Sequence, residues 1–115
     1  MADRVDSWHQ YAPANRYADF SPCSFFVSPG FWKYDTTPWL ERDPQAFEDA
    51  VAPMKASSAK WLLVETWNQY HEGTQIEPAT LYRHNHNSSP EPVSSYGYEY
   101  VDILAKYFGE ARESP

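Results

Sequence analysis

The residues best suited to chemistry lie in one stretch, Val64–Pro78 (VETWNQYHEGTQIEP), directly after the apolar run Trp61–Val64. The stretch combines three glutamates, a histidine, two aromatic residues and three amides around Gly73. Carboxyl groups can act as general acids or bases, and amides can bind hydroxyl groups. Lysine or serine would be enough to keep a surface loop soluble, so this composition favours a catalytic or ligand-binding loop.

Two short apolar runs are expected to form buried strands. The first is Ser24–Ser28, closed by Pro29 and Gly30, and the second is Trp61–Val64, extending to Thr66. Neither run alternates strictly between apolar and polar residues, which is typical of parallel strands that are covered on both faces. A weaker third candidate is Ser7–Tyr11, ended by Pro13.

A helix is predicted between the two better strands. Asp43 is suited to the N-cap and Pro44 to the first helical position, and apolar residues follow at helical spacing at Phe47, Val51 and Met54. Because proline lacks a backbone N–H, we expect Pro53 to end the regular part of this helix near Ala50–Ala52.

A second helix is predicted from about Tyr96 to Phe108, with Gly109 as its stop signal. Its apolar stripe consists of Tyr100, Ile103, Leu104, Tyr107 and Phe108. Two or three parallel strands with two helices would leave sheet edges bare. The pattern therefore favours an α/β fold that forms the end of a larger repeating protein.

The loop from Glu65 to Glu77 follows a strand of this α/β pattern. In α/β sheets and barrels the ligand-binding and catalytic groups lie at the carboxyl ends of the strands. The strand order thus gives this loop a functional interpretation that its polarity alone would not.

The segment Asn68–Pro78 (NQYHEGTQIEP) resembles the N-E-W-H-E-G-T-x-I-E-P signature of glycoside hydrolase family 99 and its relatives, endo-acting mannosidases and mannanases on a (β/α)8 barrel. Upstream, Phe26–Phe31 (FVSPGF) resembles the V-x-P-G-F/Y turn of that family, and Arg42-Asp43 and Tyr96-Gly97-x-x-Tyr100 fit its pattern. The resemblance extends from about Ser7 to Phe108.

A complete barrel of this type takes about 250 residues, whereas this sequence has 115. The resemblance therefore implies the C-terminal portion of a (β/α)8 barrel, with two to three parallel strands and two helices. On this interpretation residues 1–108 form a partial glycoside hydrolase-like domain and residues 109–115 a frayed tail. A truncated gene product, a split reading frame and a deliberate fragment all remain open.

The resemblance implies hydrolysis of O-glycosidic bonds in mannose-containing or related glycans by two carboxylates three residues apart. The general acid falls on Glu72, but the general base falls on Gln69. An amide cannot accept the proton, and loss of a general base commonly costs about 10²–10⁴-fold in rate. Glu65, or acids outside this sequence, could supply the second carboxylate. The alternatives are a catalytically impaired carbohydrate-binding relative and an inactive fragment.

Several further residues are candidates for binding a carbohydrate substrate. Asn68 suits a sugar hydroxyl, and Trp67 is expected to pack inward instead. The other candidates are Tyr70 and His71 in the same loop, Trp32 and Tyr34 after Pro29-Gly30 on the same side of the sheet, and Tyr11. The aromatic content of 17% fits either a core rich in rings or a surface that stacks on sugars.

The bulk composition argues against other classes of partner. Nine basic residues against 16 acidic ones give a net charge of −7, which disfavours nucleic acid. No apolar stretch approaches the ~18 residues of a membrane span. We expect no metal and no other cofactor, because His84 and His86 have no third ligand at a suitable spacing, and Cys23 is the single cysteine.

The start of the sequence, MADRVDSWHQYAP, lacks the apolar region of a signal peptide. The cellular location is left open, including a secreted or periplasmic one if a longer form carries a signal peptide. The oligomeric state is also left open.

Overall fold

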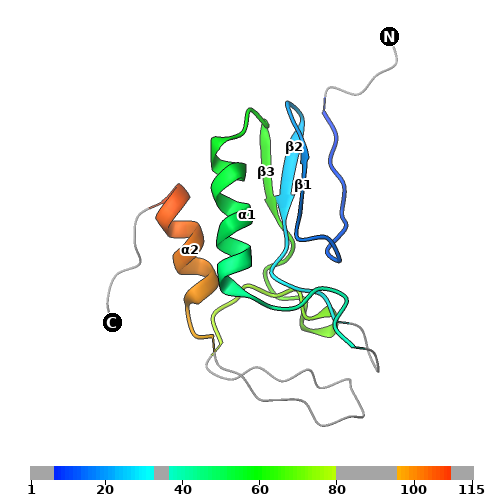
Figure 1. Cartoon of the computed structure of the whole chain (residues 1–115), viewed down its shortest axis with the longest axis vertical. Helices are drawn as coiled ribbons and strands as arrows, with labels where there is room; N and C mark the ends of the chain where they lie inside the picture. The colour runs from blue at the N-terminus through cyan, green and yellow to red at the C-terminus, as the bar shows by residue number, and fades with distance from the viewer. Residues whose placement is uncertain (1–6, 33–36, 80–95, 110–115) are drawn as a thin grey trace.

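A small mixed sheet with two helices on one side forms the fold. The computed structural model describes residues 7–32, 37–79 and 96–109. The sheet order is β1 (Tyr17–Phe20), β2 (Ser24–Val27) and β3 (Trp61–Val64). Helix α1 (Pro44–Ala56) connects β2 to β3, which are parallel, and α2 (Glu99–Phe108) packs against α1 on the side away from the sheet (Figure 1). The predicted α/β class, the positions of β2 and β3 and both helices are confirmed. The expectation that both strands are buried holds for β2 but is wrong for β3, where Trp61 is 52% and Leu62 38% exposed because β3 lies at the edge of the sheet.

The third strand differs from the prediction in both place and direction. Residues 7–11 form no strand, and β1 instead pairs antiparallel with β2, with Tyr17 opposite Val27 and Phe20 opposite Ser24. The expectation that all strands are parallel is therefore wrong for this edge. A tight connection, in which Cys23 N–H donates to the Phe20 carbonyl at 2.9 Å, favours the antiparallel pairing. The half-exposed sequence YADF lacks the apolar run by which buried strands are recognised.

Helix α1 begins as predicted, since the Asp43 side chain accepts hydrogen bonds from the backbone N–H groups of residues 45 and 46. Its predicted end is wrong, because the helix passes through Pro53 and continues to Ala56. Met54, only 1% exposed, packs into the core and stabilises the last turn. The Ser57 hydroxyl then caps the helix by donating to the Met54 carbonyl at 2.8 Å.

Helix α2 begins at Glu99, three residues later than predicted. Gly97 has φ +51°, outside the right-handed helical region, so the regular helix cannot start before it. The hydroxyl of Tyr96, just upstream, donates to the Glu77 carbonyl at 2.8 Å. The helix ends at Phe108 with Gly109 as its C-cap, as predicted, and residues 110–115 of the expected tail lie outside the described part of the chain.

The hydrophobic core lies between the sheet and the two helices. Phe25 and Val27 point from β2 toward α1, since alternate residues of a strand face the same side. The remaining members are Phe47, Ala50, Val51 and Met54 of α1, Ile76, Tyr96 just before α2, and Tyr100 in the first turn of α2. Phe26 points to the opposite face, where its ring lies 6.5 Å from Phe20 and Phe20 lies 4.6 Å from Trp8.

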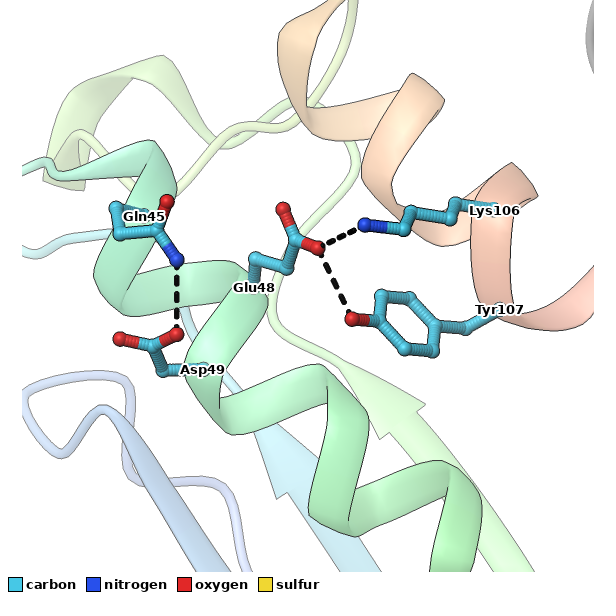
Figure 2. Close-up of polar contacts among 5 residues, drawn as sticks. All are labelled: Gln45, Glu48, Asp49, Lys106 and Tyr107. Atoms are coloured by element: carbon cyan, nitrogen blue, oxygen red, sulfur yellow. Dashed lines mark hydrogen bonds and ion pairs between the residues drawn. The ribbon is translucent and has the colours of Figure 1, made fainter.

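A polar cluster ties the two helices together at the surface. Glu48 of α1 accepts hydrogen bonds from Lys106 Nζ at 2.6 Å and from the Tyr107 hydroxyl at 2.9 Å (Figure 2). These contacts hold α2 against α1, and α1 in turn covers the sheet. The sheet and the two helices therefore form the packed support from which the loops after β2 and β3 extend.

Candidate functional site

The loop after β3 folds back on itself through two threonines. Thr66 N–H donates to the Thr74 carbonyl at 2.8 Å, and the two threonine hydroxyls are 2.8 Å apart. Ile76 N–H donates to the Thr66 carbonyl at 3.0 Å. Within the loop, Gly73 adopts φ +62° and ends a short 3₁₀ helix, η1 (Tyr70–Glu72). The loop is therefore a closed, hydrogen-bonded unit that presents residues 67–72 at the carboxyl end of the sheet.

Gln69 lies at the centre of a chain of hydrogen bonds. The Tyr11 hydroxyl donates to Gln69 Oε1 at 2.9 Å, and Gln69 Nε2 donates to Glu72 Oε1 at 2.9 Å. A carboxylate at position 69 could accept from Tyr11 but could not donate to Glu72, whereas an amide does both. The glutamine is thus matched to its two neighbours.

Glu65 is the most buried acid of the site, with only 5% of its surface exposed. It directly follows β3, and its Oε2 accepts a hydrogen bond from Ala12 N–H at 3.2 Å. Burial raises the pKa of Glu65 to about 7, and the Ala12 hydrogen bond opposes this only in part. A carboxyl with this pKa exchanges protons near neutral pH, as a general acid or base requires.

The segment Tyr11–Ala12 brings the two acids into one site. Its backbone binds Glu65 and its tyrosine hydroxyl binds the Gln69–Glu72 pair. Partial burial raises the pKa of the Tyr11 phenol, and the negative charges of Glu72 and Glu65 raise it further. The tyrosine therefore remains a neutral hydrogen-bond donor at physiological pH.

Trp32 joins the site from the loop after β2. Its backbone N–H donates to the Glu72 carbonyl at 2.7 Å. The residue also lines a pocket of about 110 Å³, formed by Phe31, Trp32, Pro38, Leu40, Glu41, Arg42 and Gly73. Its lining combines apolar residues with the charged Glu41 and Arg42, and its volume lies below the ~300 Å³ at which ligand pockets typically begin, so it could take only part of a ring-shaped ligand.

Other candidates of the loop point elsewhere. The Tyr70 hydroxyl donates to Glu77 Oε1 at 3.0 Å, and burial together with that contact raises the pKa of Tyr70 to about 12. Asn68 is exposed, and its carbonyl accepts from the Tyr70 N–H at 2.9 Å. The expectation that Trp67 packs inward is wrong, because 53% of its surface is exposed. The chain bends at Glu65, directly after β3, so Trp67 does not continue the strand.

Two predicted binding residues are not placed by the structure. Tyr34 lies outside the described residues, and so does the side chain of His71, whose backbone belongs to η1. The pair His84 and His86 also lies outside the described part. Within residues 7–32, 37–79 and 96–109, no group of three or more His, Cys, Asp or Glu side chains is arranged to hold a metal ion.

Sequence reasoning missed three residues that build the site. Thr66 and Thr74 close the loop, and their signal in the sequence was two hydroxyl residues at the ends of one polar stretch. Arg42 was noted only as part of a short motif, yet its guanidinium donates to the carbonyls of Gly73 and Gln75. Its ring contacts with Tyr96 and Tyr100 join residues from two of the motifs that carried the family resemblance.

Among the helices that the structure describes, none has the length and apolar character needed to cross a membrane. A scan against protein-family models finds no match for this chain, and searches of the curated proteins and of the solved structures find none either.

Proposed function

We propose that this chain carries a carbohydrate site of glycoside hydrolase type, related to family 99, that acts on O-glycosidic bonds of mannose-containing or related glycans. The observation that carries the proposal is the hydrogen-bonded series Tyr11–Gln69–Glu72, with the buried Glu65 held by the next residue, Ala12. Two carboxyl groups in unlike surroundings at one site are what glycoside cleavage uses.

The surroundings of Glu65 and Glu72 differ, and this difference bears on which of them acts as general acid and which as general base. Glu65 exchanges its proton near neutral pH because it is buried, whereas Glu72 Oε1 accepts a hydrogen bond from the Gln69 amide. The family resemblance assigns the general acid to Glu72 instead. Either assignment uses these two carboxyl groups, and Gln69 serves as the bridge that orients one of them.

The proposal includes membership of a (β/α)8 barrel for the unit β2–α1–β3. The parallel pairing of β2 and β3 around α1 and the placement of the acids after β3 support it. Strand β1 occupies the edge of β2 that a preceding parallel strand would use. In a complete barrel β1 would therefore have to leave this edge.

A second candidate function is carbohydrate binding without turnover. It is favoured by Gln69, whose two amide atoms are both engaged with neighbours and which cannot act as a base. In that case a sugar would pack against the half-exposed ring of Tyr11 and the pocket between Trp32 and Gly73.

One set of variants tests both functions. The protein is assayed for binding and hydrolysis of α-mannosides and related glycans, with Glu72→Gln, Glu65→Gln and Gln69→Glu compared with wild type. An enzyme should lose about 10²–10⁴-fold in rate in each of the two Glu→Gln variants. Glu48→Gln, which makes the same chemical change on the α1–α2 surface (Figure 2), is the control and should retain activity.

The outcomes separate the candidates. If wild type binds the glycan without hydrolysing it, and Gln69→Glu gains hydrolysis, carbohydrate binding without turnover is the correct function. Absence of both binding and hydrolysis in wild type would refute both candidates. Hydrolysis that is retained in both Glu72→Gln and Glu65→Gln would show that the reaction uses groups other than these two carboxyls.

A further inference from the structure

Arg42 holds the candidate loop from outside. It lies just before α1, and its guanidinium reaches across to the loop after β3, where Nη1 donates to the Gly73 carbonyl at 2.8 Å and Nη2 to the Gln75 carbonyl at 2.6 Å. These two carbonyls flank Thr74. Both terminal nitrogens of the guanidinium therefore bind one three-residue segment of the loop backbone, Gly73–Gln75.

The segment Gly73–Gln75 also determines the backbone position of Gln69, which contacts Glu72. Thr74 N–H donates to the Gln69 carbonyl at 3.3 Å, and the Thr74 hydroxyl meets that of Thr66. Thr66 Oγ1 in turn accepts from Gln69 N–H at 3.1 Å. The backbone of Gln69 is thus fixed by Thr66 and Thr74, and Thr74 sits between the two carbonyls that Arg42 binds.

Arg42 is itself fixed by three other parts of the fold. Its guanidinium carbon lies 4.8 Å from the ring centre of Tyr96 and 4.6 Å from that of Tyr100, within the range of cation–π contacts. At Gly30, after β2, a Cβ would lie 2.7 Å from Arg42 Cγ, so the glycine leaves room for the arginine stem. The side chain connects the β2 turn, the start of α1 and the start of α2 to the loop.

We propose that Arg42 is the positioning residue of the candidate site: it holds Gly73–Gln75 so that Gln69 Nε2 stays within hydrogen-bond distance of Glu72. An arginine is required because its planar fork reaches two carbonyls while stacking on rings, whereas a lysine offers one compact charge. The proposal concerns the geometry of the loop, and only its consequence for carbohydrate rests on the proposed function.

The test compares wild type with Arg42→Met and Arg42→Lys. Methionine keeps an apolar stem but removes both hydrogen bonds, and lysine keeps the charge and can replace one of them. The control is Lys106→Met, which removes a cation that also donates a hydrogen bond and lies 5.4 Å over a ring, that of Tyr107, away from the loop.

Two measurements report on the loop. Amide hydrogen exchange is followed at Thr66, which donates to the Thr74 carbonyl, and at Trp32, which donates to the Glu72 carbonyl, with Val51 in α1 as the reference for global opening. NMR follows the side-chain amide signals of Gln69. In Arg42→Met we expect exchange at the two loop amides to rise about tenfold or more relative to Val51, and the Gln69 signals to move toward those of a free amide.

Arg42→Lys should restore part of the protection and shift the Gln69 signals less, and the Lys106→Met control should change neither readout. Equal acceleration at Thr66, Trp32 and Val51 would mean that the arginine only stabilises the whole fold, and would overturn the proposal. Unchanged loop exchange and Gln69 signals would overturn it as well. If Arg42→Met does not fold, Arg42→Lys decides by the same comparison.

These readouts need no carbohydrate, so the two proposals fail separately. A wild-type protein without carbohydrate binding or hydrolysis refutes the proposed function and leaves the role of Arg42 in the loop intact. An undisturbed loop in both Arg42 variants refutes the positioning role and leaves the proposed function intact. Where hydrolysis is found, a positioning role predicts a larger fall in kcat than rise in KM, because the reacting pair is displaced.

Discussion

The burial of Glu65 leads to a prediction about how stability depends on pH. Its side chain is 5% exposed, and burial raises its pKa from the ordinary value of 4.5 to about 7. A carboxyl whose pKa is higher in the folded state binds protons more tightly there than in the unfolded chain. Its favourable contribution is therefore complete below pH 4.5 and is lost as the pH rises through 7.

The size of this effect follows from the change in pKa. A shift from 4.5 to about 7 corresponds to about 3.4 kcal/mol of unfolding free energy, at about 1.36 kcal/mol per pKa unit. Because pH 5 already lies above 4.5, at most about 2.5 kcal/mol can be lost between pH 5 and pH 8.5. Solvent near the loop screens part of this, so we expect a loss of about 1–2.5 kcal/mol. The substitution Glu65→Gln removes the titrating group, while the amide oxygen can still accept from Ala12 N–H.

The assay is urea unfolding of wild type and Glu65→Gln at pH 5 and pH 8.5, followed by tryptophan fluorescence. Between pH 5 and pH 8.5 the unfolding free energy of the variant should rise by about 1–2.5 kcal/mol relative to that of wild type. Glu48→Gln is the matched control, because hydrogen bonds from Lys106 and Tyr107 lower the pKa of Glu48 (Figure 2). It should show no such gain. Identical pH dependence in wild type and Glu65→Gln would refute the conclusion that Glu65 titrates near neutral pH.

Substitutions at two further positions test the packing of α1, which covers the sheet behind the site. Phe47→Ala should lower the free energy of unfolding by about 3–5 kcal/mol, because the ring is fully buried between the sheet and α2; a loss below about 1 kcal/mol in urea unfolding would contradict this packing. Asp43→Ala should cost about 1 kcal/mol through loss of the helix cap, and Asp43→Asn much less. Equal losses in both Asp43 variants would argue against the capping role.

The elements that sequence predicted well are those with strong local signals. Helix α1 follows from an N-cap and a 3.6-residue apolar spacing, and β2 and β3 follow from short apolar runs with turn residues after them. Each of these signals needs only neighbouring residues to be read. Strand β1 was not predicted because its half-exposed residues carry no apolar run, and its direction depends on the turn before β2.

The continuation of α1 through Pro53 shows where a local signal in the sequence leads to a wrong prediction. Proline removes one helical hydrogen bond, so a proline in a helical pattern predicts that the helix ends there. The packing of Met54 into the core stabilises the last turn, and that contact is visible only once the sheet and the helix are assembled. Local propensity was overridden by tertiary packing.

The sequence by itself determined that the acids, amides and aromatic residues of Val64–Pro78 follow an apolar strand, because composition and the order of segments are properties of the chain. It also identified Gln69 as the residue that cannot serve as a base. Only the tertiary structure decided that Tyr11, 58 positions away, donates to Gln69, and that Ala12 holds Glu65. Burial and hydrogen bonds between distant segments determine the pKa of Glu65, so no local pattern could have predicted it.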